Sequence, residues 1–86
     1  MNDVFEEVVV QVYDKGRLGI SGIGIQPVDG SVEEQSIRMC QIMACAIGRE
    51  IGCLYKDDEE KAVKIAARLS YEILAELSEA LENAKN

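Results

Sequence analysis

The chain has 86 residues and a net charge of −7, with nine Lys or Arg, sixteen Asp or Glu and no His. Without His, the chain lacks Ser-His-Asp triads, Cys-His pairs and His-ligated metal sites. The acidic balance argues against binding duplex nucleic acid, because phosphates are bound mainly by Lys and Arg. A hydrophobic fraction of 48% predicts a folded chain, and the length predicts a single domain over residues 1–86.

We expect a cytoplasmic protein, because the sequence shows neither a signal peptide nor a membrane-spanning segment. The first seven residues are acidic and lack the basic start and apolar stretch of a signal peptide. The longest apolar stretch, residues 39–47, is too short to span a bilayer, so we expect no membrane partner. Three cysteines with no CxxC spacing predict small buried thiols in a reducing compartment, with no metal and no cofactor: Cys40, Cys45 and Cys53.

Residues 4–28 are predicted to form a β-hairpin. Residues 4–13 are rich in β-branched side chains that partly alternate, and residues 14–17 supply a turn. In the return strand, residues 18–25, the apolar side chains change from one parity to the other. Because side chains alternate between the two faces of a strand, this change of phase predicts a bulge or a bend near Ser21–Gly22.

Two helices are predicted after the hairpin, over residues 31–55 and 57–84. Ser31 and Glu34 form a capping box at the start of the first helix, and Asp57 with Glu60 gives a looser signal for the second. Because the connection is so short, the helices should fold back on each other. The predicted fold is α+β: an N-terminal β-hairpin followed by an antiparallel two-helix hairpin, assembled as a symmetric oligomer.

The expectation of an oligomer comes from the first helix. Its apolar side chains cover about 240° of the circumference, more than one hairpin and one neighbouring helix can bury. We therefore expect the protein to bind itself, as a homodimer or a higher oligomer. The predicted interface residues on this helix extend the apolar face: Met39, Ile42, Met43, Ala46 and Ile47.

The second helix combines an apolar stripe at 4-3-4-3-4 spacing with an ordered row of charges. Cations in its first half and acids in its second half lie at equal distances from Ser70. An antiparallel pairing with the same helix of a second subunit would set each cation beside an acid. The interface residues predicted on this basis are Lys61, Lys64, Arg68, Glu72, Glu76 and Glu79.

A narrow polar strip on the first helix, formed by Arg38, Gln41 and Arg49, has two interpretations. The first is an ion pair between these arginines and acids of the hairpin or of the second helix. The second is a site for a phosphate or carboxylate ligand beside Gly22 and Gly24. The glycines follow a GxxGxG spacing, which is not the dinucleotide-binding GxGxxG, and their structural interpretation is close packing against Ala44, Gly48 and Gly52.

Three functions remain open, and none is enzymatic, because no nucleophile has a base within reach. The first is a protein-binding inhibitor or regulator whose acidic surface contacts a basic surface on its partner. In size, acidity and absence of catalytic residues the chain resembles small phage-encoded accessory proteins. The second is a protein that binds or sequesters a small anionic ligand or a nucleotide. The third is a purely structural oligomerisation protein.

Overall fold

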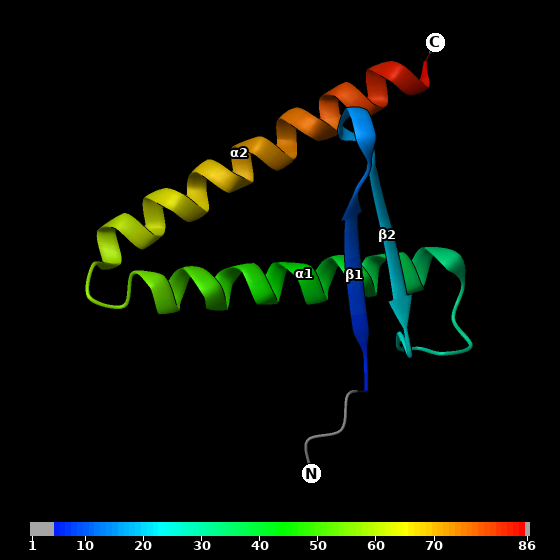
Figure 1. The fold of residues 1–86 in the computed structure, drawn as a ribbon, viewed down its shortest axis with the longest axis horizontal. Helices are drawn as coiled ribbons and strands as arrows, with labels where there is room; N and C mark the ends of the chain where they lie inside the picture. Colours follow the sequence, from blue (N-terminus) through cyan, green and yellow to red (C-terminus); the bar gives the residue numbers. More distant parts are fainter. Residues whose placement is uncertain (1–4, 86) are drawn as a thin grey trace. The chain divides into compact units, whose positions relative to one another are not determined.

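The computed structural model describes residues 5–85, in which a β-hairpin is followed by two helices (Figure 1). Strands β1 (Glu7–Val12) and β2 (Leu18–Ile23) flank a short 3₁₀ turn, Asp14–Gly16. Helices α1 (Val32–Leu54) and α2 (Glu59–Ala84) follow. This order confirms the α+β layout, whereas the symmetric assembly stays a prediction. Val4, the first residue of the predicted hairpin, lies outside the described residues.

The chain divides into two compact units, Met1–Ala46 and Ile47–Asn86, with the boundary inside α1. The first unit contains the hairpin and the first part of α1. The second contains the last eight residues of α1 and all of α2. The expectation of a single domain stays a prediction.

The two strands pair antiparallel without interruption, from Glu7 opposite Ile23 to Val12 opposite Leu18. The predicted bulge at Ser21–Gly22 is therefore wrong. One face of the hairpin is apolar throughout because the even-numbered residues share it: Val8, Val10, Val12, Leu18, Ile20 and Gly22. The hairpin lies over the first part of α1 (Figure 1). Val10 and Ile20 of this face line a hollow with Met43 of α1.

The change of apolar phase is real, but it occurs after β2 ends. Gly24 has a φ of 65°, a left-handed conformation that reorients the chain beyond the strand. Ile23 consequently stays 70% exposed, while Ile25 is 7% exposed in the core of the first unit. The turn of the hairpin also uses positive φ, at Lys15 and at Gly16.

Both helices begin at side-chain caps. The Ser31 hydroxyl accepts a hydrogen bond from the Glu34 amide at 3.1 Å, as the capping box predicts. The cap of α2 is Asp58 rather than Asp57, because its carboxylate accepts from the Lys61 amide at 3.1 Å. The connection spans residues 55–58, so it is longer than the single residue between the predicted helices, and its backbone is hydrogen-bonded at Tyr55 and Asp58.

The core of the second unit is small. Ile51, near the end of α1, is 8% exposed and is the buried side chain of this unit among the described residues. Ala62, Ile65 and Leu69 are half-buried on one face of α2. Because α1 contributes only eight residues here, about 12 Å of helix, it covers only the beginning of a helix about 39 Å long.

We expect Gly24→Ala to destabilise the first unit by about 1–3 kcal/mol, measured by denaturant unfolding. The positive φ disfavours a side chain, and a Cβ at this position would meet the Phe5 carbonyl oxygen. Gly48→Ala is the control, because nothing lies within 4 Å of its Cβ position inside α1. That change should leave stability unchanged or raise it by up to about 1 kcal/mol. Equal effects of the two substitutions would contradict the role given to Gly24.

Candidate functional site

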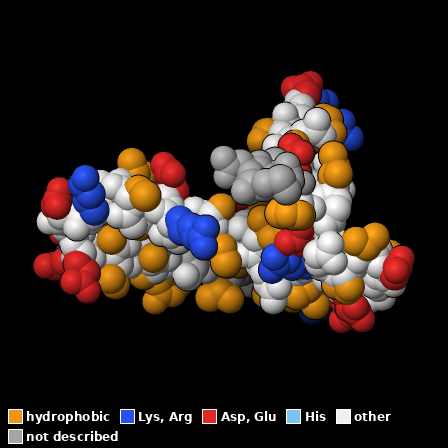
Figure 2. Space-filling model, turned by 90° about the horizontal axis from the view of Figure 1, so that it is seen from below, with side chains coloured by type: hydrophobic (Ala, Val, Ile, Leu, Met, Phe, Trp, Pro, Cys, Tyr) orange, Lys and Arg blue, Asp and Glu red, His pale blue; other side chains and the backbone are white. Residues whose placement is uncertain are grey.

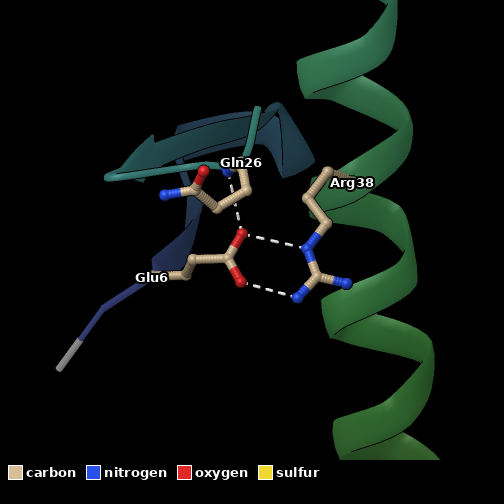
Figure 3. A network of polar contacts seen from close by, with 3 residues as sticks. All are labelled: Glu6, Gln26 and Arg38. Carbon is tan, nitrogen blue, oxygen red and sulfur yellow. Dashed lines mark hydrogen bonds and ion pairs between the residues drawn. The ribbon is translucent and has the colours of Figure 1, made fainter. Parts of the chain in front are cut away.

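Arg38 of α1 forms a bidentate ion pair with Glu6, which lies just before β1 (Figure 3). Arg38 Nη2 donates to Glu6 Oε1 at 2.6 Å, and Arg38 Nε donates to Oε2 at 2.9 Å. The backbone amide of Gln26 also donates to Oε2, at 2.9 Å. One carboxylate thus joins three segments of the first unit: the start of the hairpin, the loop after it and α1.

The electrostatics of the pair follow from these bonds. The hydrogen bond from Arg38 is the main cause that lowers the pKa of Glu6 from 4.5 to about 2, and the Gln26 amide lowers it further. The same hydrogen bond raises the pKa of Arg38. The Glu6 side chain is only 15% exposed, whereas that of Arg38 is 40% exposed. The ion pair predicted between the strip and an acid of the hairpin is therefore confirmed for Arg38.

The rest of the predicted strip does not gather around Arg38. Gln41 and Arg49 are exposed, and neither makes a side-chain hydrogen bond or ion pair within residues 5–85. Arg49 belongs to the second unit, whereas Arg38 and Gln41 belong to the first. The Nε and Nη2 donors on one edge of the Arg38 guanidinium are bonded to Glu6, which leaves only its other edge for a phosphate.

Gly22 and Gly24 line a hollow of about 190 Å³ in the first unit, together with Ile25, Val28, Gln35 and Met39. Gln35 Nε2 donates to the Val28 carbonyl at 3.0 Å, so the side-chain amide of Gln35 is engaged in a hydrogen bond within the first unit. A Cβ on Gly22 would lie 2.9 Å from Met39 Sδ, so this glycine allows close packing on α1. The close packing expected at Gly48 and Gly52 is not found, because nothing lies within 4 Å of their Cβ positions.

The predicted interface on α1 is partly covered by the chain itself. Three of its residues are half-buried under the hairpin: Met39, Ile42 and Met43. The other two, Ala46 and Ile47, are exposed. The hairpin therefore accounts for part of the wide apolar arc that predicted a second subunit. The cysteines, expected to be buried, are all exposed in the single chain.

The larger uncovered surface lies on α2, and we call it the apolar stripe. All nine of its positions are exposed: Val63, Ala66, Ser70, Ile73, Leu74, Leu77, Ala80, Leu81 and Ala84. The five large side chains among them are 51–63% exposed. Figure 2 shows hydrophobic side chains at the surface beside charged ones. The 4-3 spacing of apolar residues in the sequence indicates this surface. The interface predicted on this helix nevertheless consisted of charged residues only.

The charged residues predicted to form that interface occupy a different face of α2. Around an ideal helix they lie about 120–180° from Ser70, at the centre of the stripe. Lys64 pairs with Glu60 at 3.1 Å, and Arg68 pairs with Glu72 at 3.5 Å, both within α2. A second helix packed on the apolar stripe would not contact these charged side chains. The predicted charge pairing about Ser70 stays a prediction, and it requires a face of α2 other than the stripe.

Comparisons with protein families, with characterised proteins and with solved structures find no match. In the described part of the chain, neither helix combines the length and apolarity needed to cross a bilayer. Within residues 5–85, no cluster of three or more His, Cys, Asp or Glu side chains could hold a metal ion.

We expect the contribution of Glu6 to stability to disappear in acid. A carboxylate whose pKa falls from 4.5 to about 2 on folding stabilises the native state above pH 4.5. That stabilisation is lost as the pH falls from 4.5 through about 2. The unfolding free energy of Glu6→Gln should therefore lie below that of the parent at pH 6, and the difference should shrink toward pH 2.

Glu7→Gln is the control for this pH dependence, since it removes an exposed carboxylate that makes no side-chain bond within residues 5–85. Denaturant unfolding of the three proteins at pH 6, 4 and 2 provides the measurement. A difference between the parent and Glu6→Gln that stays constant across this range would contradict the assignment.

Proposed function

We propose that this chain is a small acidic, non-enzymatic binding protein that self-associates and acts as an inhibitor or regulator through protein–protein contact. The observation that carries the proposal is the apolar stripe of α2, which nothing in its own unit covers. A row of large apolar side chains exposed along a whole helix face is typical of a surface that binds another protein.

The energy available from the stripe supports this proposal. Fully burying one such side chain stabilises by about 1.5–3 kcal/mol, and the five large ones are roughly half exposed. Covering them would contribute on the order of 5 kcal/mol per chain. This is as large as the whole unfolding free energy of many small domains, so an uncovered stripe leaves the fold short of a main source of stability.

The charge distribution favours a partner with a basic surface. Residues 69–84 carry four Glu and no Lys or Arg. The carbonyl end of the helix dipole adds to this negative potential instead of offsetting it. A cationic surface on the partner would offset the negative potential of the four Glu and of the helix dipole, and it would also accelerate association.

The anionic-ligand alternative is weakened, because the charge of Arg38 is already balanced by Glu6, which takes the Nε and Nη2 donors of its guanidinium. A ligand on the remaining edge of the guanidinium would lie close to the Glu6 carboxylate, which repels an anion. The purely structural alternative uses the same apolar stripe as our proposal. It differs only in requiring no partner besides the chain itself.

We expect light scattering at micromolar concentration to give at least ~19 kDa, twice the chain mass of 9.5 kDa. Leu77→Asp should shift the protein toward 9.5 kDa, because a charge buried without a partner is strongly unfavourable. Ala75→Asp, on the opposite face of α2, is the matched control and should leave the mass unchanged. A parent that scatters as a 9.5 kDa species would contradict self-association.

The partner is tested by affinity capture from the native host at low and high salt. We expect a partner with a basic surface that binds at low salt and is released at high salt, because exposed charge pairs are screened. Capture should weaken when Glu79 and Glu82 are changed to Gln. A partner retained at high salt would contradict the electrostatic part of the proposal, and no partner at all would favour the purely structural alternative.

A further inference from the structure

The apolar stripe of α2 is separate from the face that α2 turns toward the end of α1. The half-buried side chains Ala62, Ile65 and Leu69 are centred about 100° around the helix from Ser70. The end of α1 therefore occupies one face of α2 and leaves most of the neighbouring face, which carries the stripe, uncovered within this unit. Ile73 lies at the border, where it lines a hollow with Ile47 of α1 and Leu69.

At the 4-3 positions of the stripe, large and small side chains follow an order that is complementary to its own reverse: Val63, Ala66, Ser70, Ile73, Leu77 and Ala80. The midpoint of α2, Glu59–Ala84, falls between Tyr71 and Glu72. A second α2 running in the opposite direction over the same midpoint would set every large residue of the 4-3 spacing against a small one. The facing pairs are Val63 with Ala80, Leu77 with Ala66, and Ile73 with Ser70.

We propose that α2 packs against the α2 of a second copy of this chain, antiparallel, about a two-fold axis at the helix midpoint. The inference rests on the proposed function, and it adds the identity of one partner, the contact face and the direction of pairing. Antiparallel helices with alternating large and small core residues approach closely and leave no cavity at the contact.

Ser70 fits an apolar contact because its hydroxyl is already satisfied. Ser70 Oγ donates to the Ala66 carbonyl at 3.0 Å within α2, so burial would not leave an unpaired donor. Its small volume matches Ile73 of the opposing helix. The one polar residue in the centre of the stripe therefore adds no obstacle to the pairing.

Charge complementarity favours the antiparallel direction over the parallel one. The second half of α2 carries four Glu and no cation, whereas the first half carries Lys61, Lys64 and Arg68 together with Glu59 and Glu60. These side chains lie on another face of α2 and make no direct pairs across the stripe, but an antiparallel mate keeps the two acidic halves apart and opposes the two helix dipoles. A parallel mate would place eight glutamates side by side along the two acidic halves.

Disulfide cross-linking tests the direction and the register. The full chain is used after Cys40, Cys45 and Cys53 are changed to Ala. Val63→Cys and Ala80→Cys are made in separate chains, which are mixed and oxidised. The proposal predicts an efficient cross-link between the two different chains, because these positions face each other.

Neither variant should cross-link to itself, since two copies of position 63 lie about 25 Å apart along the antiparallel pair. Val63→Cys mixed with Ala75→Cys is the control, because position 75 lies on the opposite face of α2. A cross-link of Val63→Cys with itself would overturn the proposal in favour of a parallel pair. A mixed yield no higher than that of the control would also overturn it.

A size swap provides a second, independent measurement. Ala66→Leu should weaken self-association by about tenfold in sedimentation. The new leucine at position 66 would face Leu77 of the second copy, and this crowded contact would occur twice about the two-fold axis. The double variant Ala66→Leu/Leu77→Ala restores a large residue opposite a small one and should recover the parent affinity. Ala75→Leu, on the far face, should change nothing.

The outcomes separate this inference from the proposed function. If Ala66→Leu associates as tightly as the parent, or if the double variant does not recover, the α2 pairing is wrong. If the protein still scatters at twice the chain mass in that case, self-association stands and uses another surface. If the parent scatters as a single chain, both the pairing and the self-association fall.

Discussion

The scarcity of buried apolar surface governs this structure. Nearly half of the residues are hydrophobic, yet Ile25 and Ile51 are the buried apolar side chains among residues 5–85. Conformational entropy opposes the ordering of every residue, and hydrophobic burial is the main term that compensates it. Within each unit, long helices are ordered around little buried surface, and the association that we propose would supply further burial. The exposed stripe of α2 is where the most apolar side chains are available for this.

In the first unit, a polar interaction complements the small core. Glu6 holds Arg38 and the Gln26 amide, so it joins the strand, the loop and the helix in a place where few apolar contacts do so. Gly22 lets the hairpin lie close to Met39, and Gly24 turns Ile25 inward. The unit therefore depends on one ion pair and two glycines as much as on apolar packing.

The elements of the fold could be predicted from the sequence because their signals are local. The hairpin follows from β-branched residues around a turn, and the helices follow from periodicity and from caps such as Ser31. The predicted bulge was wrong because a shift of apolar phase does not say where the chain turns. Parity alone cannot distinguish a bulge at Gly22 from a left-handed residue at Gly24.

The site was predicted less completely because it depends on contacts between distant residues. The interpretation of Arg38 as half of an ion pair was correct, but choosing Glu6 among the acids of the hairpin required the register of the strands. On α2, the predicted interface was assigned to charged residues because their positions are symmetric about Ser70 in the sequence. The helix itself places those charges behind the stripe, where Lys64 and Arg68 already have partners.

The exposed stripe of α2 also affects how the protein would behave when it is diluted. If burial of the stripe by another chain supplies several kcal/mol, folding and association form one coupled equilibrium. The melting temperature would then rise with protein concentration, and a dilute sample would lose helix without any change of temperature or pH. The amount of protein in the cell would thereby set the fraction that is folded, so that low expression alone would keep the chain inactive.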